Sequence, residues 1–568
     1  MSELDPTSPT APSASLRAAV AVLDVPKNMP HKTALHLRLE QLSPRRRGLL
    51  RVLAALLCAT CMVLGSPDYN QWYLGFVGWV FWLAAIEGLA PKRAFWLGWL
   101  CGTATVFFGF FWLTELLIRF ADFPTWGTLL VHFIFAAFQG LQWAVPAAAL
   151  NWLRRRTGRD VLLLAPLVWV AGEAVMPHIF PSYLALMWCW QPLWLQVAEI
   201  GGVTTVGLVQ LAINAGLYAA LRDWLLARSL NRRALVVFAA TLIGTPIYGA
   251  VRMAQIDAMI AQSPKLKIGV VQGNFGIMEW GNPRMKFQIL RKEQQESARL
   301  EAAGAEVLLW GETAYPFSYA LPRGDGFDLP QANPRRVRRD FTAPLVFGVV
   351  TADRKVSEFA WNTARVLEAD GRLGDNYDKV YPLWFGEYTP LVDPHWFKEM
   401  VPSASHINPG PGPKALRVHT GPEGQHEWRL GPLICYEDIL PRFARGVAAE
   451  GIHAFVNLTN DSWFGKSKEQ DQHMGLAVLR TIENRRALLR SVNAGISVYV
   501  DPAGRVLERI ESTNPDEDGP LPASGFVADV PMIDPDYRTL YTRTGELFNA
   551  LVLLGLCGIG LRGRRRAA

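Results

Sequence analysis

Hydrophobic and polar positions divide the chain into two unlike parts. Residues 48–252 consist of long apolar runs, whereas residues 263–544 alternate short apolar runs with polar stretches. Apolar stretches of about 18 residues or more are typical of transmembrane helices. Eight such stretches cover approximately residues 48–65, 72–90, 94–118, 125–150, 161–177, 193–221, 234–252 and 545–561. The pattern therefore predicts a multi-pass α-helical membrane domain with eight transmembrane helices.

Basic residues occur mainly in alternate loops between these apolar stretches. Clusters at residues 45–47, 154–159 and 562–566 all fall on the same side of the predicted membrane, and the intervening loops carry almost no positive charge. Loops rich in lysine and arginine face the cytoplasm. We therefore expect both ends of the chain in the cytoplasm and the polar half outside it.

These patterns predict four segments. Residues 1–43, rich in proline, serine, threonine and alanine, are expected to be a flexible cytoplasmic tail. Residues 44–252 are the membrane domain with seven transmembrane helices, and residues 253–544 are an extracytoplasmic domain. Residues 545–568 add the last transmembrane helix and a basic cytoplasmic tail.

The polar half carries both strand and helix patterns. Short apolar runs at 266–271, 307–310, 345–350, 454–458 and 496–500 indicate strands. Residues 284–303 and 472–490 have apolar positions at three-to-four spacing, which predicts helices. Alternation of this kind is typical of sheets covered by helices.

Composition agrees with a membrane protein and argues against a nucleic-acid partner. The chain of 568 residues has 21 tryptophans, only 19% charged residues and a net charge of +7. Soluble domains have about 25% charged residues. Because the excess positive charge lies at the ends of apolar segments, it indicates membrane orientation rather than a nucleic-acid surface.

Cys435 differs from the other five cysteines. Cys58, Cys61, Cys101, Cys189 and Cys557 lie in or beside apolar segments, whereas Cys435 is alone in the polar half, where a strand-like run meets a polar turn. Two interpretations are open from position alone. The residue is either a buried small apolar side chain or a catalytic nucleophile.

Three further charged residues follow or lie near predicted strand ends. Glu312 follows the apolar run 307–310, and Lys379 and Glu387 lie in an aromatic-rich loop. Each residue alone is typical of a surface charge. Together with Cys435 they offer a nucleophile, a base and a cation.

Several short motifs resemble those of one superfamily. Residues 271–274, 377–379, 385–388, 434–437, 460–465 and 493–497 are similar to signatures of the nitrilase, or carbon–nitrogen hydrolase, superfamily. Joined to eight apolar segments, they resemble the apolipoprotein N-acyltransferase family. The resemblance implies an α/β domain with a nitrilase-like αββα sandwich.

The resemblance also implies roles for particular residues. Glu312 would act as general base, Lys379 would stabilise the oxyanion, Cys435 would be the nucleophile, and Glu387 would be essential for orienting the others. We assign substrate binding to Trp280, Asn362, Tyr436, Glu437 and Trp463. Trp280, Trp384, Trp463 and Phe464 either guide acyl chains or pack in the core. No metal and no cofactor are expected.

The implied reaction has two steps and takes place at a membrane. An acyl chain would pass from a phospholipid to a thioester on Cys435, and then to the N-terminal amine of a lipid-modified apolipoprotein. The resemblance implies a monomer in the bacterial inner (cytoplasmic) membrane, with the catalytic domain facing the periplasm.

Two other functions remain open from the sequence. One is a membrane-tethered amidase or nitrilase-type hydrolase that uses water as the acceptor. The other is a transporter or scaffold with an inactive appended domain, which predicts functional polar residues deep in the spans. Glu87, Glu115, Glu173 and Glu199 instead lie toward span ends or loops.

Overall fold

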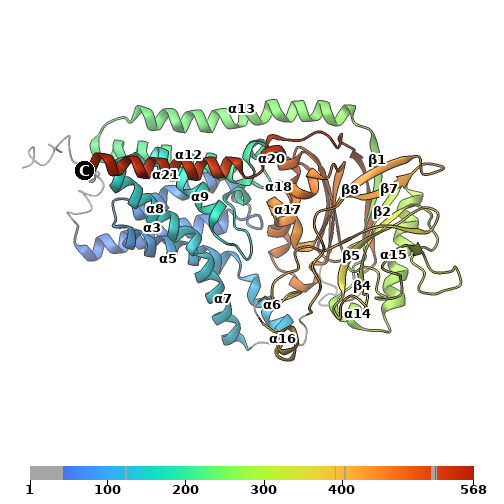
Figure 1. Cartoon of the computed structure of the whole chain (residues 1–568). Coiled ribbons are helices and arrows are strands. Elements are labelled where there is room, and N and C mark those ends of the chain that lie inside the picture. Colours follow the sequence, from blue (N-terminus) through green and yellow to red (C-terminus); the bar gives the residue numbers. More distant parts are fainter. Residues whose placement is uncertain are drawn as a thin grey trace, which may run out of the picture.

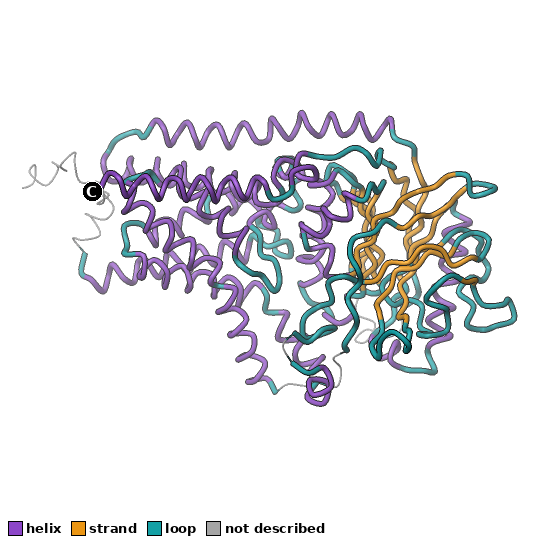
Figure 2. The backbone as a smooth tube through the Cα atoms, in the orientation of Figure 1, coloured by secondary structure: helices purple, strands orange, loops and turns teal. Residues whose placement is uncertain are grey.

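The structure, a computed structural model, describes residues 42–121, 124–390, 392–401, 405–512, 519 and 521–567. Helices are gathered at one end of the molecule and two β-sheets at the other (Figures 1 and 2). A single long helix, α13 (Arg232–Gln262), runs alongside the helical part and leads directly into the first strand. The predicted N-terminal tail lies outside the described residues, apart from positions 42 and 43.

The helical part is built from the predicted apolar segments. Its elements are α3 (Pro44–Leu64), η1 (Trp72–Phe76), α4 (Gly78–Ile86), α5 (Pro91–Gly109), α6 (Trp112–Ala121), α7 (Thr125–Gln139), α8 (Leu141–Thr157), α9 (Val161–Val175), η2 (Leu184–Trp188), α10 (Pro192–Leu195), α11 (Ala198–Gly201), α12 (Val203–Ala227), α13 and α21 (Leu547–Ala567).

Two of the predicted continuous helices are broken. The segment 94–118 bends by 56° between α5 and α6. The segment 193–221 is divided into α10, α11 and α12. Gly202 separates α11 from α12, because its φ of +80° lies outside the helical range and is tolerated by glycine.

Fewer helices than predicted are long enough to cross a bilayer. Among the described residues, four are long and apolar enough, namely Pro44–Leu64, Thr125–Thr157, Val203–Leu225 and Arg232–Gln262. The bent pair α5 and α6 is a fifth if it forms one span. Trp72–Ile86, Val161–Val175 and Leu547–Gly563 are shorter apolar helices. These helices are those of a membrane domain, and the number eight stays a prediction.

The other part contains two mixed sheets. The first has the order β13-β1-β2-β4-β5-β6-β3 and the second the order β12-β11-β10-β9-β8-β7. Their strands are β1 (Lys265–Gln272), β2 (Val307–Leu309), β3 (Gly326–Phe327), β4 (Leu345–Thr351), β5 (Trp361–Leu367), β6 (Arg372–Asp378), β7 (Leu416–Thr420), β8 (His426–Ile434), β9 (Ala454–Thr459), β10 (Ala487–Val492), β11 (Ile496–Val500), β12 (Val506–Glu511) and β13 (Ser524–Pro531). All five strands predicted from apolar runs are present.

Helices flank the two sheets. The remaining elements are α14 (Ile277–Gly281), α15 (Lys286–Ala302), α16 (Pro394–Met400), η3 (Cys435–Ile439), α17 (Pro441–Ala449), η4 (Asp461–Phe464), α18 (Glu469–Asn484) and α20 (Leu540–Thr544). Figure 1 shows α15 on the far side of the sheets, and α17 and α18 between the sheets and the helical part. This is the predicted nitrilase-like sandwich.

The predicted helix 472–490 is too long at its C-terminal end. The helix α18 ends at Asn484, because Arg485 adopts a left-handed φ of +52° and strand β10 begins two residues later. Residues 487–492 are buried at every position of strand β10. The apolar residues of this strand follow those of the helix almost directly, so the sequence pattern extended the predicted helix to residue 490. A short apolar run fits either structure.

The helix α18 belongs to two hydrophobic cores. Met474 and Val478 pack in the core between the sheets, whereas Leu476 and Leu479 pack in the core of the helical part. At the C-terminal end of the helix, the Arg485 guanidinium donates to Glu199 of α11 over 2.9 Å. The two parts therefore form one continuous structure around α18.

Candidate active site

Cys435 occupies a strained turn at the end of β8. Its φ of +50° lies in the left-handed region, which costs a non-glycine residue about 1 kcal/mol or more. The side chain is partly exposed. Such a turn, at the junction of a strand and a short helix, presents the thiol at the edge of the sheet.

Glu312 lies in the turn that follows strand β2, where it contacts Asn362 and Lys379. Its carboxylate is 6% exposed, and its Oε1 atom accepts a hydrogen bond from Asn362 Nδ2 over 2.6 Å. The same oxygen lies 3.2 Å from Lys379 Nζ. The Asn362 amide also lies 3.4 Å from Glu387 Oε1, so one side chain contacts both carboxylates.

Lys379 follows strand β6 and lies between two carboxylates. Its Nζ atom lies 2.6 Å from Glu387 Oε2 and its side chain is 1% exposed. Glu387 is in turn held by the backbone N–H of Leu383, which donates to Oε2 over 2.9 Å. The structure thus brings Lys379 into contact with both Glu312 and Glu387.

Burial and charge decide the protonation states at this site. Burial raises the pKa of Glu312, an effect that the Lys379 charge opposes. Burial alone would lower the pKa of Lys379, but Glu312 and Glu387 hold it well above its usual value. Burial, followed by the charge of Glu312, raises the pKa of Cys435. The resting site therefore holds an ammonium group and a neutral thiol, which needs a base to become nucleophilic.

Glu437 ties the cysteine turn to the lysine loop. Its fully buried carboxylate accepts hydrogen bonds from Tyr377 Oη (2.7 Å) and from the backbone N–H groups of Val380 (2.6 Å), Tyr381 (3.1 Å) and Ile434 (2.7 Å). Burial raises its pKa to about 7, against the effect of these donors. Protein groups thus surround the carboxylate, which fixes Cys435 relative to Lys379.

The predicted aromatic residues lie at different places. Trp280 Nε1 donates a hydrogen bond over 3.1 Å to the carbonyl oxygen of Thr313, the residue that follows Glu312. Tyr436 donates to the carbonyl oxygen of Ile179, in the helical part, over 2.6 Å. Trp463 packs against the core of the helical part, whereas Trp384 is 56% exposed.

Cys435 lines a cavity at the junction of the two parts. Its walls include Phe110, Trp112 and Phe180 from the helical part together with Phe464. Trp112 packs edge-on against both Phe180 and Phe464, with ring centroids 5.4 Å apart in each pair. Predominantly apolar walls of this kind suit a hydrophobic ligand.

Sequence reasoning missed the walls from the helical part and the position of Asn362 between two carboxylates. Phe110 and Phe180 are separated from Cys435 by more than 250 residues of sequence, and nothing in their local pattern indicates a cavity. Asn362 had been assigned to substrate binding. Its hydrogen bonds with Glu312 and Glu387 depend on the pairing of strands β5 and β6, which places Thr363 opposite Asp378.

Comparison with known proteins gives consistent matches over both parts. The model of the apolipoprotein N-acyltransferase N-terminal domain matches residues 58–216, and the carbon–nitrogen hydrolase model matches residues 291–517. The apolipoprotein N-acyltransferase of Bdellovibrio bacteriovorus is 30% identical over 484 residues, covering 81% of this chain and 84% of that protein. The enzyme of the same name from Gloeobacter violaceus is 28% identical, covering 94% of this chain and 99% of that protein.

A solved structure of an amidase resembles part of the chain. A mutant of the Nesterenkonia AN1 amidase, from the nitrilase superfamily, is 20% identical and covers 51% of this chain and 98% of its own, with a TM-score of 0.35.

Proposed function

The chain belongs to the apolipoprotein N-acyltransferase family, and we propose that Glu312, Lys379 and Cys435 carry out its reaction. An acyl chain passes from a phospholipid to the Cys435 thiol, and from this thioester to the N-terminal amine of a diacylglyceryl-cysteine apolipoprotein. The observation that carries the proposal is the buried Lys379–Glu312 pair, whose charges act on the Cys435 thiol, together with an apolar cavity that Cys435 lines and that residues of the helical part partly wall.

The first step follows from the protonation states. Glu312 accepts the thiol proton while Sγ of Cys435 attacks the ester carbonyl carbon. The negative charge that develops on the carbonyl oxygen is stabilised by the Lys379 ammonium group. Collapse breaks the bond to the glycerol oxygen, which takes the proton from Glu312 and leaves as a lysophospholipid.

The second step reverses these roles. The amine of the apolipoprotein attacks the thioester carbonyl, and Glu312 accepts a proton from the amine nitrogen. Collapse of the second tetrahedral intermediate breaks the carbon–sulfur bond and forms the amide. The departing thiolate recovers a proton from Glu312, which returns both groups to their starting states.

Asn362, Glu387 and Glu437 act by positioning these groups. Asn362 and Glu387 hold Glu312 and Lys379 by direct contacts, and Glu437 fixes the turn that carries Cys435. Tyr436, whose hydroxyl contacts Ile179, anchors the turn to the helical part. Trp280 supports the backbone at Thr313, and Trp463 packs beside the cavity wall at Phe464.

The location of the cavity supports a lipid donor. Phe110, between α5 and α6, and Trp112, the first residue of α6, line it, which supports entry of an acyl chain from the membrane. The protein is embedded in a membrane. The basic clusters at 45–47, 154–159 and 562–566 support the bacterial inner membrane, with the sheet domain in the periplasm.

We also propose the division of the chain predicted above. Residues 44–252 form the membrane domain, and residues 253–544 form the catalytic domain, whose first strand begins at Lys265. Residues 545–568 return the chain to the membrane. We expect a monomer, because one chain supplies every residue assigned to the reaction.

A reconstituted assay with purified protein tests this function. Phospholipid alone should give one equivalent of lysophospholipid and an acylated protein, detected by mass spectrometry, and lipopeptide should restore turnover. Cys435→Ala should abolish the acylated species, whereas Cys557→Ala, at an exposed cysteine, should retain it. Continuous release of free fatty acid without lipopeptide would instead show a hydrolase.

A further inference from the structure

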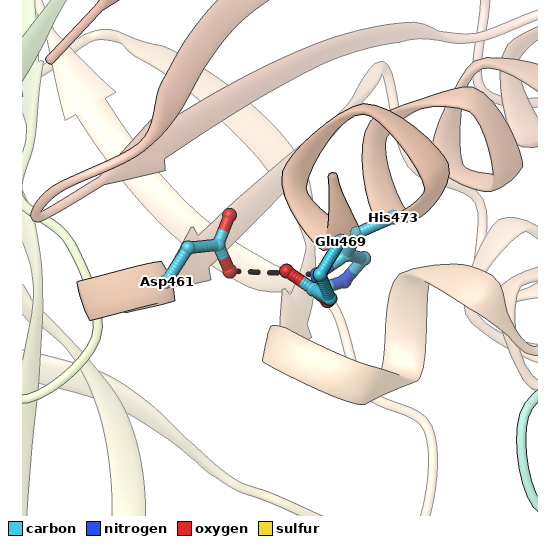
Figure 3. Close-up of side chains that lie close together, drawn as sticks. All are labelled: Asp461, Glu469 and His473. Carbon is cyan, nitrogen blue, oxygen red and sulfur yellow. Dashed lines mark ion pairs between the residues drawn. The ribbon is translucent and has the colours of Figure 1, made fainter. Parts of the chain in front are cut away.

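A second group of buried polar side chains lies in the wall of the Cys435 cavity. Asp461 is the first residue of η4, and Glu469 and His473 are one turn apart on α18. Their exposed fractions are 0%, 6% and 6%. Figure 3 shows the three side chains directed toward one another. None of them takes part in the reaction proposed above.

Each of these side chains leaves one polar atom without a hydrogen-bond partner among the residues that the structure describes. The atoms are Asp461 Oδ1, Glu469 Oε2 and His473 Nδ1, all fully shielded from solvent. His473 Nδ1 lies 3.4 Å from Asp461 Oδ1 and 3.3 Å from Glu469 Oε1, contacts that do not have hydrogen-bond geometry. Buried polar atoms without partners destabilise a fold by about 1–3 kcal/mol each. Three in one place indicate a ligand between them.

The buried carboxylates around this group outnumber the permanent cations that pair with them. Asp438, Asp461 and Glu469 contribute three carboxylates, all buried. Arg490 contributes one guanidinium, with Nη1 2.5 Å from Asp438 Oδ2 and Nη2 2.8 Å from Asp461 Oδ2. Two negative charges remain if His473 is neutral. One divalent cation would neutralise these two negative charges, and two bound protons are the alternative.

We propose that Asp461, Glu469 and His473 bind one Zn²⁺ ion. One ligand atom from each residue lies within 4.8 Å of the other two. A tetrahedral site with bonds of about 2.1 Å separates its ligand atoms by roughly 3.4 Å, close to the two distances measured from His473 Nδ1. One imidazole and two carboxylates suit zinc, whereas magnesium and calcium prefer oxygen ligands alone.

His473 is already oriented as a metal ligand. Its Nε2 atom lies 2.8 Å from Asp438 Oδ1, so Nε2 donates to this carboxylate and Nδ1 is the ring nitrogen directed at Asp461 and Glu469. A carboxylate on the far nitrogen is the arrangement that commonly supports a metal-bound histidine. Arg490 holds this carboxylate in turn.

The ion would join η4 to the first turn of α18. Glu469 and His473 also line the cavity that contains Cys435. The ion would therefore reach its ligands through this cavity and make the wall formed by η4 and α18 more rigid. This site goes beyond the proposed acyl transfer, which needs no metal.

Metal content of the full-length protein in detergent tests the proposal. Protein treated with a chelator and then dialysed against Zn²⁺ should contain one equivalent by elemental mass spectrometry. Glu469→Gln should weaken zinc binding by at least tenfold in a calorimetric titration, because it removes a charged ligand of nearly the same shape. Asp471→Asn is the matched control, since Asp471 is on the same helix and pairs with Arg509.

Three results would overturn the proposal. The first is less than stoichiometric zinc in the unaltered protein, which would mean that protons balance the charges. The second is unchanged binding in Glu469→Gln and His473→Gln. The third is loss of zinc in Cys435→Ala, which would place the ion on the thiol. Cobalt substitution tests the ligands without any variant, so it remains informative if a variant fails to fold. A sulfur-to-cobalt charge-transfer band in the unaltered protein would contradict ligation by nitrogen and oxygen.

Discussion

The ammonium group of Lys379 lies 2.6 Å from Oε2 of Glu387 and 3.2 Å from Oε1 of Glu312. The two carboxylates therefore share one cation, and Glu387 makes the shorter contact. Glu312 thus shares its cation with a second negative charge, which adds to burial in raising the pKa of Glu312 and suits a group that must accept a proton.

Replacing Glu387 should expose its positioning role. Glu387→Gln keeps the shape but removes the charge that holds Lys379, so we expect the rate of thioester formation to fall by about 10- to 100-fold. The affinity for the phospholipid should change little. Glu399→Gln, at an exposed glutamate of α16, is the control. Equal rates for both variants would show that Glu387 is only a surface charge.

Thioester formation should slow in acid. Glu312 must be deprotonated to act as base, and burial raises its pKa above the usual value for a glutamate. The rate should therefore fall by about tenfold per pH unit below that pKa, measured by quenched mass spectrometry of the acylated protein. Glu312→Gln should be slow at every pH and lack this acid limb. An acid limb of the same midpoint in Glu312→Gln would assign it to another group.

The cavity should set the length of the transferred acyl chain. Phe464 is 7% exposed and packs on Trp112. Phe464→Trp adds bulk inside the cavity, so the preference should shift to shorter chains by about tenfold in relative kcat/KM. Competition between phospholipids of different chain length measures the shift. Phe327→Trp, at a side chain that is 66% exposed, should leave the preference unchanged.

Glu293 should lower the free energy of unfolding as the pH rises. Burial, and then the charge of Glu296, raises its pKa from 4.5 to about 8, and its Oε2 atom has no hydrogen-bond partner. The folded protein holds a proton that the unfolded chain releases, so stability declines between those two pKa values, by up to about 1.4 kcal/mol per pH unit. The advantage in Tm of Glu293→Gln should therefore widen with pH. Parallel Tm curves would contradict this.

In the sequence, Glu312 and Cys435 each follow a strand-like apolar run, whereas Lys379 lies in an aromatic-rich loop. The resemblance to a known family is what grouped these three residues into one site. Their protonation states were not predictable, since these depend on burial and on neighbours from other strands. Asn362 illustrates the limit: its contacts with Glu312 and Glu387 follow from sheet pairing, which local patterns do not specify.

Local patterns were least informative where two parts of the chain meet. The helical part was predictable as apolar segments, but not its break at Gly202 or its bend between α5 and α6. In the sequence, Trp112 is one of several aromatic residues in the apolar segment 94–118, and only the fold shows that it lines the cavity. The end of α18 at Arg485 was hidden because the following strand is equally apolar.

The shared helix α18 has a practical consequence for anyone seeking a smaller enzyme. An excised sheet domain would expose Leu476, Leu479 and Ile482 to water, since these side chains pack in the core of the helical part. It would also lose the Ile179 carbonyl that accepts from Tyr436, next to the nucleophile. Water would then reach the sulfur freely, and any activity left to such a fragment would favour hydrolysis.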